Sequence, residues 1–263
     1  MTGRVALVTG AGRGIGAATV LALAQAGWSV LATDSAADDP ALPYPMATPD
    51  DLARLAAQAG PAGQVHTLIA DVRDPAAVGA AVAEAESRWG GLDAAIAAAG
   101  VIAGGVPLWQ LPENQQQAVL DVDLGGVLTL ARAAIPALLR RPAPRSGRFL
   151  AVASAAATRG LPMLAAYCAA KAGVAGLIRA LAAELADSGV TANAVSPGST
   201  ATPILAESAR LYGLPAAGAF AQQQPIGRLL DPAEVAAVLA FLASPGSSGM
   251  TGAVVPVDGG LGL

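Results

Sequence analysis

Short aliphatic runs alternate with longer alanine- and leucine-rich segments along nearly the whole chain. The short runs predict strands, because aliphatic and β-branched residues bounded by turn residues favour extended structure. The expected strands are Val5–Thr9, Ser29–Thr33, Val65–Ala70, Ala94–Ala98, Arg148–Ala153, Thr191–Val195 and Val254–Val257. The longer segments have helical period and predict helices at roughly Gly14–Ala26, Pro49–Ala59, Pro75–Trp89, Pro112–Leu139, Leu164–Ala186 and Pro232–Ala243. This alternation predicts an α/β fold, a doubly wound parallel sheet of about seven strands with helices on both faces.

Composition favours a single folded unit. The chain has 263 residues, 54% of them hydrophobic and 13% charged, which suffices for one large covered core and excludes a disordered protein. No Ser/Pro-rich linker and no run of like charge divides it. We therefore expect one domain over residues 1–263.

Charge and histidine content exclude several kinds of site. A net charge of −4 with scattered arginines offers no basic face for nucleic acid. The sole histidine, His66, excludes any site that needs two histidines. We therefore expect neither a metal site nor a Ser-His triad.

Location is inferred from cysteine usage and apolar stretches. Cys168 is the single cysteine and cannot form an internal disulfide, which agrees with a reducing compartment. The most apolar long stretch, Ala94–Trp109, falls short of the roughly 20 residues of a spanning helix. The N-terminal segment has no signal-peptide cleavage site. We expect a cytoplasmic protein without a membrane segment.

The segment Val5–Gly16, VALVTGAGRGIG, predicts a strand, a glycine turn and a helix start. Gly10, Gly14 and Gly16 would let the backbone approach a pyrophosphate, which the helix N-terminus attracts. Asp34 ends the next strand, where its carboxylate can accept hydrogen bonds from an adenosine ribose and repel a 2'-phosphate, so NAD is favoured over NADP. Arg13 favours NADP weakly, since a guanidinium there could contact a phosphate. The alternative is that the glycine segment forms a tight turn that binds no ligand, with Asp34 as an ordinary turn residue.

Tyr167 and Lys171 stand four residues apart in AAYCAAKAG, residues 165–173, and share one helix face. An ammonium beside a phenol stabilises the phenolate and lowers the tyrosine pKa from about 10 towards working pH, so that Tyr167 could exchange a proton with a substrate. Alone, such a pair is more often an amphipathic surface pair. The small residues of 165–173 predict a surface against which a large ligand can lie, and Ser154 ends the preceding strand run.

Several motifs then occur in a characteristic order. They are TGAGRGIG at 9–16, Asp34, DV at 71–72, Ser154 with YCAAK at 167–171, NAVSPGSTAT at 193–202, GRLLDPAEVA at 227–236 and TGAVVPVDGG at 251–260. With these motifs, essentially the whole chain resembles the single-domain group of the short-chain dehydrogenases/reductases. The resemblance implies a Rossmann-like fold and one dinucleotide-binding oxidoreductase domain.

The resemblance also implies residue roles. Tyr167 would be the acid/base, Lys171 would lower its pKa and hold the nicotinamide ribose, and Ser154 would hydrogen-bond the substrate oxygen while hydride passes between nicotinamide and carbinol carbon. The implied cofactor-binding residues are Gly10, Gly12, Arg13, Gly14, Ile15, Gly16, Asp34, Asp71, Val72, Ala98, Ala99, Gly100, Tyr167, Lys171, Pro197, Gly198, Thr200 and Thr202.

Two departures from the family pattern affect the site. Residues 97–100 read Ala-Ala-Ala-Gly where the family usually has two asparagines, so packing must replace side-chain hydrogen bonds there. Asp123 stands where the family usually carries the asparagine of a proton relay. An ionised carboxylate accepts but cannot donate hydrogen bonds, so we expect Asp123 in the catalytic set with a relay water held differently.

The segments 101–112 and 201–225 are expected to line the substrate pocket, the latter as a substrate loop. The residues expected to line the pocket are Leu108, Trp109, Ile204, Leu205, Leu211, Tyr212, Leu214 and Phe220, with Met163 as a further candidate. Such an apolar pocket suits a small lipophilic secondary alcohol or its ketone.

Two alternatives remain. A reductase of a carrier-bound acyl substrate would need a basic patch, for which Arg140, Arg141, Arg145 and Arg210 are not obviously placed. A non-catalytic dinucleotide-binding regulator would have no need of the intact Ser154, Tyr167 and Lys171.

The segment 35–51, SAADDPALPYPMATPDD, is longer than a usual strand-to-helix connection. It resembles the insertion of the mycofactocin-associated dehydrogenases, which implies a tightly held nicotinamide reoxidised by an external redox carrier; otherwise it is a surface loop. The resemblance also implies a homotetramer joined through the small-residue helices at 112–139 and 164–186.

Overall fold

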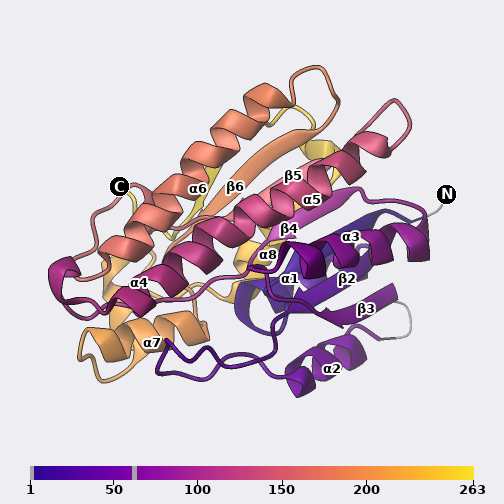
Figure 1. Cartoon of the computed structure of the whole chain (residues 1–263). Coiled ribbons are helices and arrows are strands. Elements are labelled where there is room, and N and C mark those ends of the chain that lie inside the picture. Colours follow the sequence, from indigo (N-terminus) through magenta and orange to yellow (C-terminus); the bar gives the residue numbers. More distant parts are fainter. Residues whose placement is uncertain (1–2, 61–63) are drawn as a thin grey trace.

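The computed structural model describes residues 3–60 and 64–263. Its centre is a parallel seven-stranded sheet in the order β3-β2-β1-β4-β5-β6-β7 (Figure 1). The strands are β1 (Val5–Thr9), β2 (Ser29–Asp34), β3 (Gln64–Ile69), β4 (Ala94–Ala97), β5 (Arg148–Val152), β6 (Thr191–Pro197) and β7 (Val254–Val257). Every predicted strand is confirmed, with its ends within two residues.

Helices cover both faces of the sheet, as predicted. They are α1 (Gly14–Gln25), α2 (Pro49–Gln58), α3 (Pro75–Trp89), α4 (Glu113–Leu120), α5 (Gly126–Arg140), α6 (Ala165–Glu184), α7 (Pro203–Leu211) and α8 (Pro232–Ala243). Helices α3, α5 and α6 lie on one face of the sheet (Figure 1), and their side chains share one buried cluster with it. Side chains of α1, α2 and α8 form the cluster on the opposite face. The result is the Rossmann-like, doubly wound arrangement that the pattern predicts.

The predicted helix starts at 48–49 and 74–75 are confirmed. Thr48 accepts a hydrogen bond from the Asp51 amide in a capping box, and Asp74 accepts from the amides of Ala76 and Ala77. A proline follows each cap at the first helical position, where its missing N–H costs no hydrogen bond.

The structure differs from the sequence prediction in two helical segments. The expected helix Pro112–Leu139 contains a π-helical turn, Asp121–Gly125, between α4 and α5. Such a turn inserts one residue into the hydrogen-bond ladder and rotates the following side chains. Helix α7 was expected only as part of a substrate loop, although Thr202 caps it through the Leu205 amide by the same Thr-Pro signal that begins α2.

Among the described residues, two helical stretches are long and apolar enough, by length and composition only, to cross a membrane: Glu113–Arg140 and α6. The sequence prediction considered only Ala94–Trp109 and overlooked them. Each packs one side into the sheet cluster, while Leu128 and several small residues of α6 face outwards. A homotetramer joined through these outer faces, and a cytoplasmic location, stay predictions.

Two helical glycines, Gly16 at the start of α1 and Gly79 within α3, differ in the space around them. A Cβ on Gly16 would lie 2.0 Å from the Gly10 carbonyl oxygen, whereas a Cβ on Gly79, within α3, meets no atom within 4 Å. Gly16→Ala should lower the free energy of unfolding by at least about 2 kcal/mol. Gly79→Ala should raise it by about 0.5–1 kcal/mol, because alanine restricts the unfolded chain. Urea denaturation of both variants checks this, and equal midpoints would contradict it.

Candidate active site

A cavity of about 660 Å³ opens along the carboxyl ends of the strands. Gly10 follows β1, Asp34 ends β2, Ala98 follows β4 and Ser154 follows β5, and all four line the cavity. This edge, where the strand order reverses between β1 and β4, is where doubly wound sheets bind ligands. Every residue predicted to bind the cofactor lines the cavity except Gly12.

The glycine turn and Asp34 form one unit. Gly10 has φ +64°, and a Cβ there would lie 2.4 Å from the backbone of Ala99. Asp34 accepts a hydrogen bond from the Gly12 amide at 2.9 Å, and Oδ1 accepts from Ala36 at 3.2 Å. Gly12 therefore helps to hold Asp34 in place and does not itself line the cavity, and its contact with the cofactor stays a prediction.

Arg13 points away from the role that would favour a 2'-phosphate. Its Nη1 donates to the carbonyl oxygen of Pro45 at 2.7 Å, and Nη2 contacts the Met46 sulfur at 3.6 Å. The guanidinium is therefore bound by the segment that follows β2.

A buried ion pair lies beside the cavity. Lys171 Nζ is 3.1 Å from Asp123 Oδ2, and Asp123 and Lys171 are only 0% and 4% exposed. Asp123 Oδ1 accepts from the Val101 amide at 2.7 Å, and Lys171 donates to the Val152 carbonyl at 3.1 Å. Oδ2 makes the ion-pair contact without hydrogen-bond geometry. Asp123 does not line the cavity, so the structure places it behind Lys171.

Tyr167 lies within the same group of charges. The Lys171 ammonium is 5.6 Å from the centroid of the Tyr167 ring. Burial raises the pKa of Tyr167, Lys171 and the Ser154 hydroxyl lower it, and Asp123 raises it again, with a net rise. Lys171 acts to lower the tyrosine pKa, as expected, but burial, the largest cause, and the Asp123 charge outweigh it, so the net direction is upward.

Burial and mutual attraction also shift the pKa values of Asp123 and Lys171. Burial raises the pKa of Asp123 more than Lys171 and the Val101 amide lower it. Burial acts to lower the pKa of Lys171, but Asp123 and Tyr167 outweigh it and raise that pKa. Lys171 therefore stays protonated at neutral pH.

The alanines at 97–100 are held by packing, as expected. Ala97 is buried in the core cluster, and the Ala98 amide donates to the Thr9 hydroxyl at 3.3 Å. Ala99 lies so close to Gly10 that the backbones of the two loops touch. Hence the Thr9 hydroxyl and backbone packing brace the central strand.

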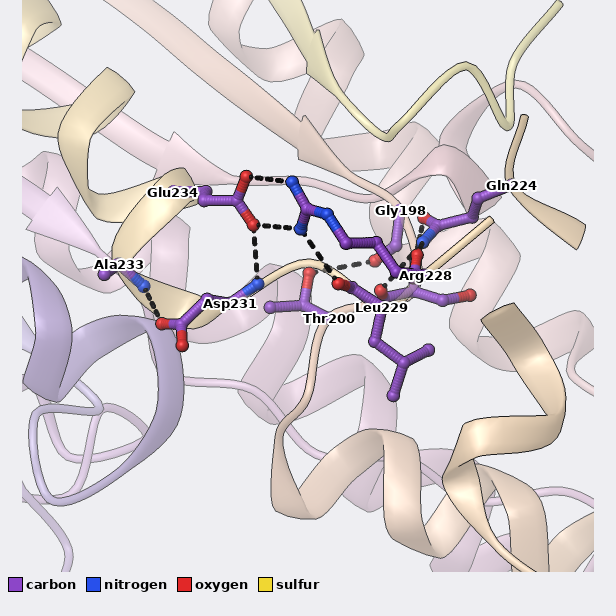
Figure 2. Close-up of polar contacts among 9 residues, drawn as sticks. Gly198, Thr200, Gln224, Arg228, Leu229, Asp231, Ala233 and Glu234 are labelled. Carbon is purple, nitrogen blue, oxygen red and sulfur yellow. Dashed lines mark hydrogen bonds and ion pairs between the residues drawn. The ribbon is translucent and has the colours of Figure 1, made fainter. Parts of the chain in front are cut away.

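The loop after β6 is braced by a buried glutamine that the sequence analysis did not identify. Gln224 is 2% exposed; Oε1 accepts from the Ser199 amide at 2.8 Å, and Nε2 donates to the Arg228 carbonyl at 2.7 Å. Figure 2 shows Gln224 beside Gly198, with Arg228 reaching Glu234 at the start of α8. This network braces the loop after β6, from which Pro197, Gly198, Ser199, Thr200 and Thr202 line the cavity.

The substrate end of the cavity differs in part from the expectation. Ile204, Leu205, Tyr212, Leu214 and Phe220 line it as expected. Four expected residues lie outside its lining: Leu108, Trp109, Met163 and Leu211. Trp109 is 84% exposed on a short helical turn, whereas Val101 and Ile102 line the cavity from the start of the same loop. Ser208 and Gln223 line it from the expected segment 201–225, whereas the sequence analysis missed Arg159, Leu161, Pro162, Leu164 and Leu261.

The small residues of α6 do not form the expected ligand surface. Ala165, Ala169 and Ala172 face outwards and Ala166 and Ala170 pack in the core, whereas the cavity is lined from this helix by Tyr167 and Lys171. The helical period places the alanines on the other faces.

Residues 35–48, here called the strap, fold down beside the cavity. Asp39, Met46 and Ala47 line it. Arg73 pairs with Asp39 at 2.6 Å, and Tyr44 accepts from the Ile102 amide at 2.8 Å. The strap is therefore attached at both the cofactor loops and the loop after β4.

Comparison with known proteins identifies the family. Residues 10–262 match a family model described as enoyl-(acyl carrier protein) reductase. The chain is 40% identical to cis-4-hydroxycyclohexanecarboxylate dehydrogenase of Sinomonas cyclohexanicum, over 98% of this chain and 96% of that protein. It is similar to the carveol dehydrogenase of Mycobacterium avium in complex with NAD, with TM-score 0.93, 32% identity and coverage of 99% and 98%. It is also similar to a single-substitution variant of actinorhodin polyketide ketoreductase with NADPH, with TM-score 0.88, 31% identity and coverage of 99% and 97%. The chain therefore belongs to the short-chain dehydrogenase/reductase family and is an NAD(P)-dependent oxidoreductase of that family.

Proposed function

We propose that the protein interconverts a lipophilic secondary alcohol and its ketone, with NAD as the hydride carrier and Tyr167 as the acid/base. The observation that carries this is the position of Ser154, Tyr167 and Lys171 along one cavity, between the glycine turn and an apolar lining. The names of the relatives support the substrate class, because carveol and a hydroxycyclohexane are cyclic secondary alcohols.

The cavity fits a dinucleotide at its glycine end. Gly10 approaches the Ala99 backbone closely, and no described side chain caps the start of α1, which supports binding of an anion by the first amides of this helix. Asp34 keeps lone pairs for ribose hydroxyls and would repel a 2'-phosphate, while Arg13 is bound to the strap. These contacts support NAD over NADP.

The chain's own residues then handle the proton. Bound NAD supplies the hydride acceptor. The Ser154 hydroxyl orients the substrate oxygen, and the Tyr167 phenolate removes the hydroxyl proton in the oxidation direction. Lys171 stabilises that phenolate, whereas Asp123 partly offsets the ammonium charge. We therefore propose Asp123 as a positioning residue that sets the pH at which Tyr167 works.

We further propose that the strap slows exchange of the cofactor, so that an external redox carrier reoxidises it in place. The attachments of Asp39 to Arg73 and of Tyr44 to Ile102 support this, as does Leu42, which is buried in a cluster with Val72. Release of the adenosine end would require these contacts to open together.

The four arginines considered for binding a carrier-bound acyl substrate do not form a free basic patch. Arg140 pairs with Glu86, Arg141 with Asp93 and Arg210 with Glu207. These guanidiniums are already engaged, so they do not form a free cationic surface. The remaining candidate, Arg145, donates to the Leu139 carbonyl.

Loss of the phenol tests the proposed reaction. Tyr167→Phe should lower kcat for a lipophilic secondary alcohol by about 10²–10⁴-fold, because the proton acceptor is gone. Affinity for NAD should stay unchanged, and Tyr212→Phe, which loses only a bond to the Pro162 carbonyl, should retain most of kcat. Steady-state kinetics and calorimetric NAD binding measure both. Full activity in Tyr167→Phe would refute the mechanism, and absence of alcohol oxidation in the unmodified protein would favour a regulator.

Counting turnovers tests the strap. Purified protein mixed with NAD and lipophilic secondary alcohols should form one equivalent of reduced nicotinamide per site and then stop until an artificial electron acceptor is added. Arg73→Gln removes the ion pair with Asp39 and should allow repeated turnover with free NAD. Arg88→Gln, which breaks a pair on the surface of α3, is the control. Many equivalents from the unmodified protein would refute the captive cofactor while leaving alcohol oxidation standing.

Asp123→Asn tests the role of the buried carboxylate. Asp123 raises the pKa of Tyr167, so its neutralisation should lower that pKa and shift the pH–rate profile of oxidation to lower pH. NAD binding should persist. Asp121→Asn removes a charge from the same π-turn, where Oδ1 accepts from Gln117, and should leave the profile unchanged. An identical profile in Asp123→Asn would exclude Asp123 from the mechanism.

A further inference from the structure

The cationic side chains that line the cavity differ in their partners. Arg73 pairs with Asp39 and Asp71, and Lys171 pairs with Asp123. Arg13, at the glycine turn, donates to the strap carbonyl of Pro45. The remaining cation, Arg159, is an exposed residue at the substrate end of the cavity, where the neighbouring Pro162 accepts a hydrogen bond from the Tyr212 hydroxyl.

Arg159 is free of any carboxylate in the part of the chain that the structure describes. Its single described side-chain hydrogen bond runs from Nη1 to the carbonyl oxygen of Leu261, and both residues line the cavity. That bond leaves Nε and Nη2 without a described partner. A guanidinium held by one Nη in this way can still offer two parallel N–H groups to a planar anion.

The surroundings of Arg159 favour an anion that is part of a lipophilic molecule. Arg159 follows the short helical turn Ala155–Ala157 that begins at Ser154, and its guanidinium is held at the Leu261 carbonyl. The other residues of this end are apolar or neutral: Leu161, Pro162, Leu164, Ile204, Leu205, Ser208, Tyr212, Leu214, Phe220, Gln223 and Leu261. A ligand that spans this lining meets one cation at its far end and Tyr167 at its near end.

We propose that Arg159 is a specificity-determining residue that binds a carboxylate on the substrate, remote from the carbinol carbon. The substrate class is then a hydroxy acid, or the corresponding oxo acid, with an apolar ring or chain between its two polar ends. This inference rests on the proposed function, since it names the substrate of the same site.

A matched pair of alcohols tests the inference. The probes are 4-hydroxycyclohexanecarboxylate and 4-hydroxycyclohexanecarboxamide, which differ chiefly in charge. Arg159→Gln should raise KM for the carboxylate by about tenfold or more, as expected for loss of a charge-assisted contact, with a smaller effect on kcat and less than about twofold change for the carboxamide. Arg159→Lys should retain part of the preference, and Arg88→Gln should retain all of it.

The same variants distinguish binding of the substrate carboxylate by Arg159 from a purely structural contact of Arg159 with Leu261. If Arg159 serves only to hold Leu261, Arg159→Gln will impair both probes equally, and that result overturns the proposal. An unchanged KM for the carboxylate also overturns it.

Calorimetry distinguishes this failure from failure of the proposed function. Titration of the carboxylate into NAD-containing protein needs no turnover, so loss of binding in Arg159→Gln supports the assignment even if neither alcohol is oxidised. Equal binding of the carboxylate by both proteins refutes it. Absence of oxidation of both probes and of neutral cyclic alcohols would count against the proposed function alone.

Discussion

The buried contact between Asp123 and Lys171 is the interaction on which the site depends. It joins the π-turn before α5 to α6, and its outer bonds reach the loop after β4 through Val101 and the end of β5 through Val152. Removal of one partner from such a pair typically costs about 3–5 kcal/mol, because the other charge is left buried. The position of Tyr167 on α6 relative to the end of β5 therefore rests on a polar contact as much as on core packing.

The same contact sets the charge around the phenol. An ammonium alone would favour the phenolate, but an ammonium beside a carboxylate is closer to a dipole, and its field at Tyr167 is weaker. Burial then raises the tyrosine pKa further. Asp123 thus helps to fix the position of Lys171, and it also reduces the stabilisation that the Lys171 ammonium gives to the Tyr167 phenolate.

Sequence patterns predicted what depends on local chemistry. Strand limits, the caps at Thr48 and Asp74 and the glycine turn all follow from neighbours in the chain. The π-turn could not be predicted, because one inserted residue hardly changes the helical period, whereas the Thr-Pro start signal of α7 was present and overlooked. Trp109 was expected in the pocket and lies in solvent, while Arg159 was missed and lines the cavity. Both side-chain directions depend on contacts between segments far apart in the chain, which apolar content alone does not encode.

The strap makes the two ends of the cavity interdependent. It follows β2 at the cofactor end, yet Tyr44 reaches across to accept the Ile102 amide on the substrate side. Burial raises the pKa of Tyr44, so its phenol stays neutral and the contact is not switched by ordinary changes in pH. Pro43 also shares a smaller hollow with Glu207 of α7. Because α7 supplies Ile204 to the cavity lining, movement of the strap to release a dinucleotide would disturb the substrate end as well. If the strap retains the cofactor as proposed, cofactor retention and substrate shape are linked through two segments that are remote in sequence and adjacent in space.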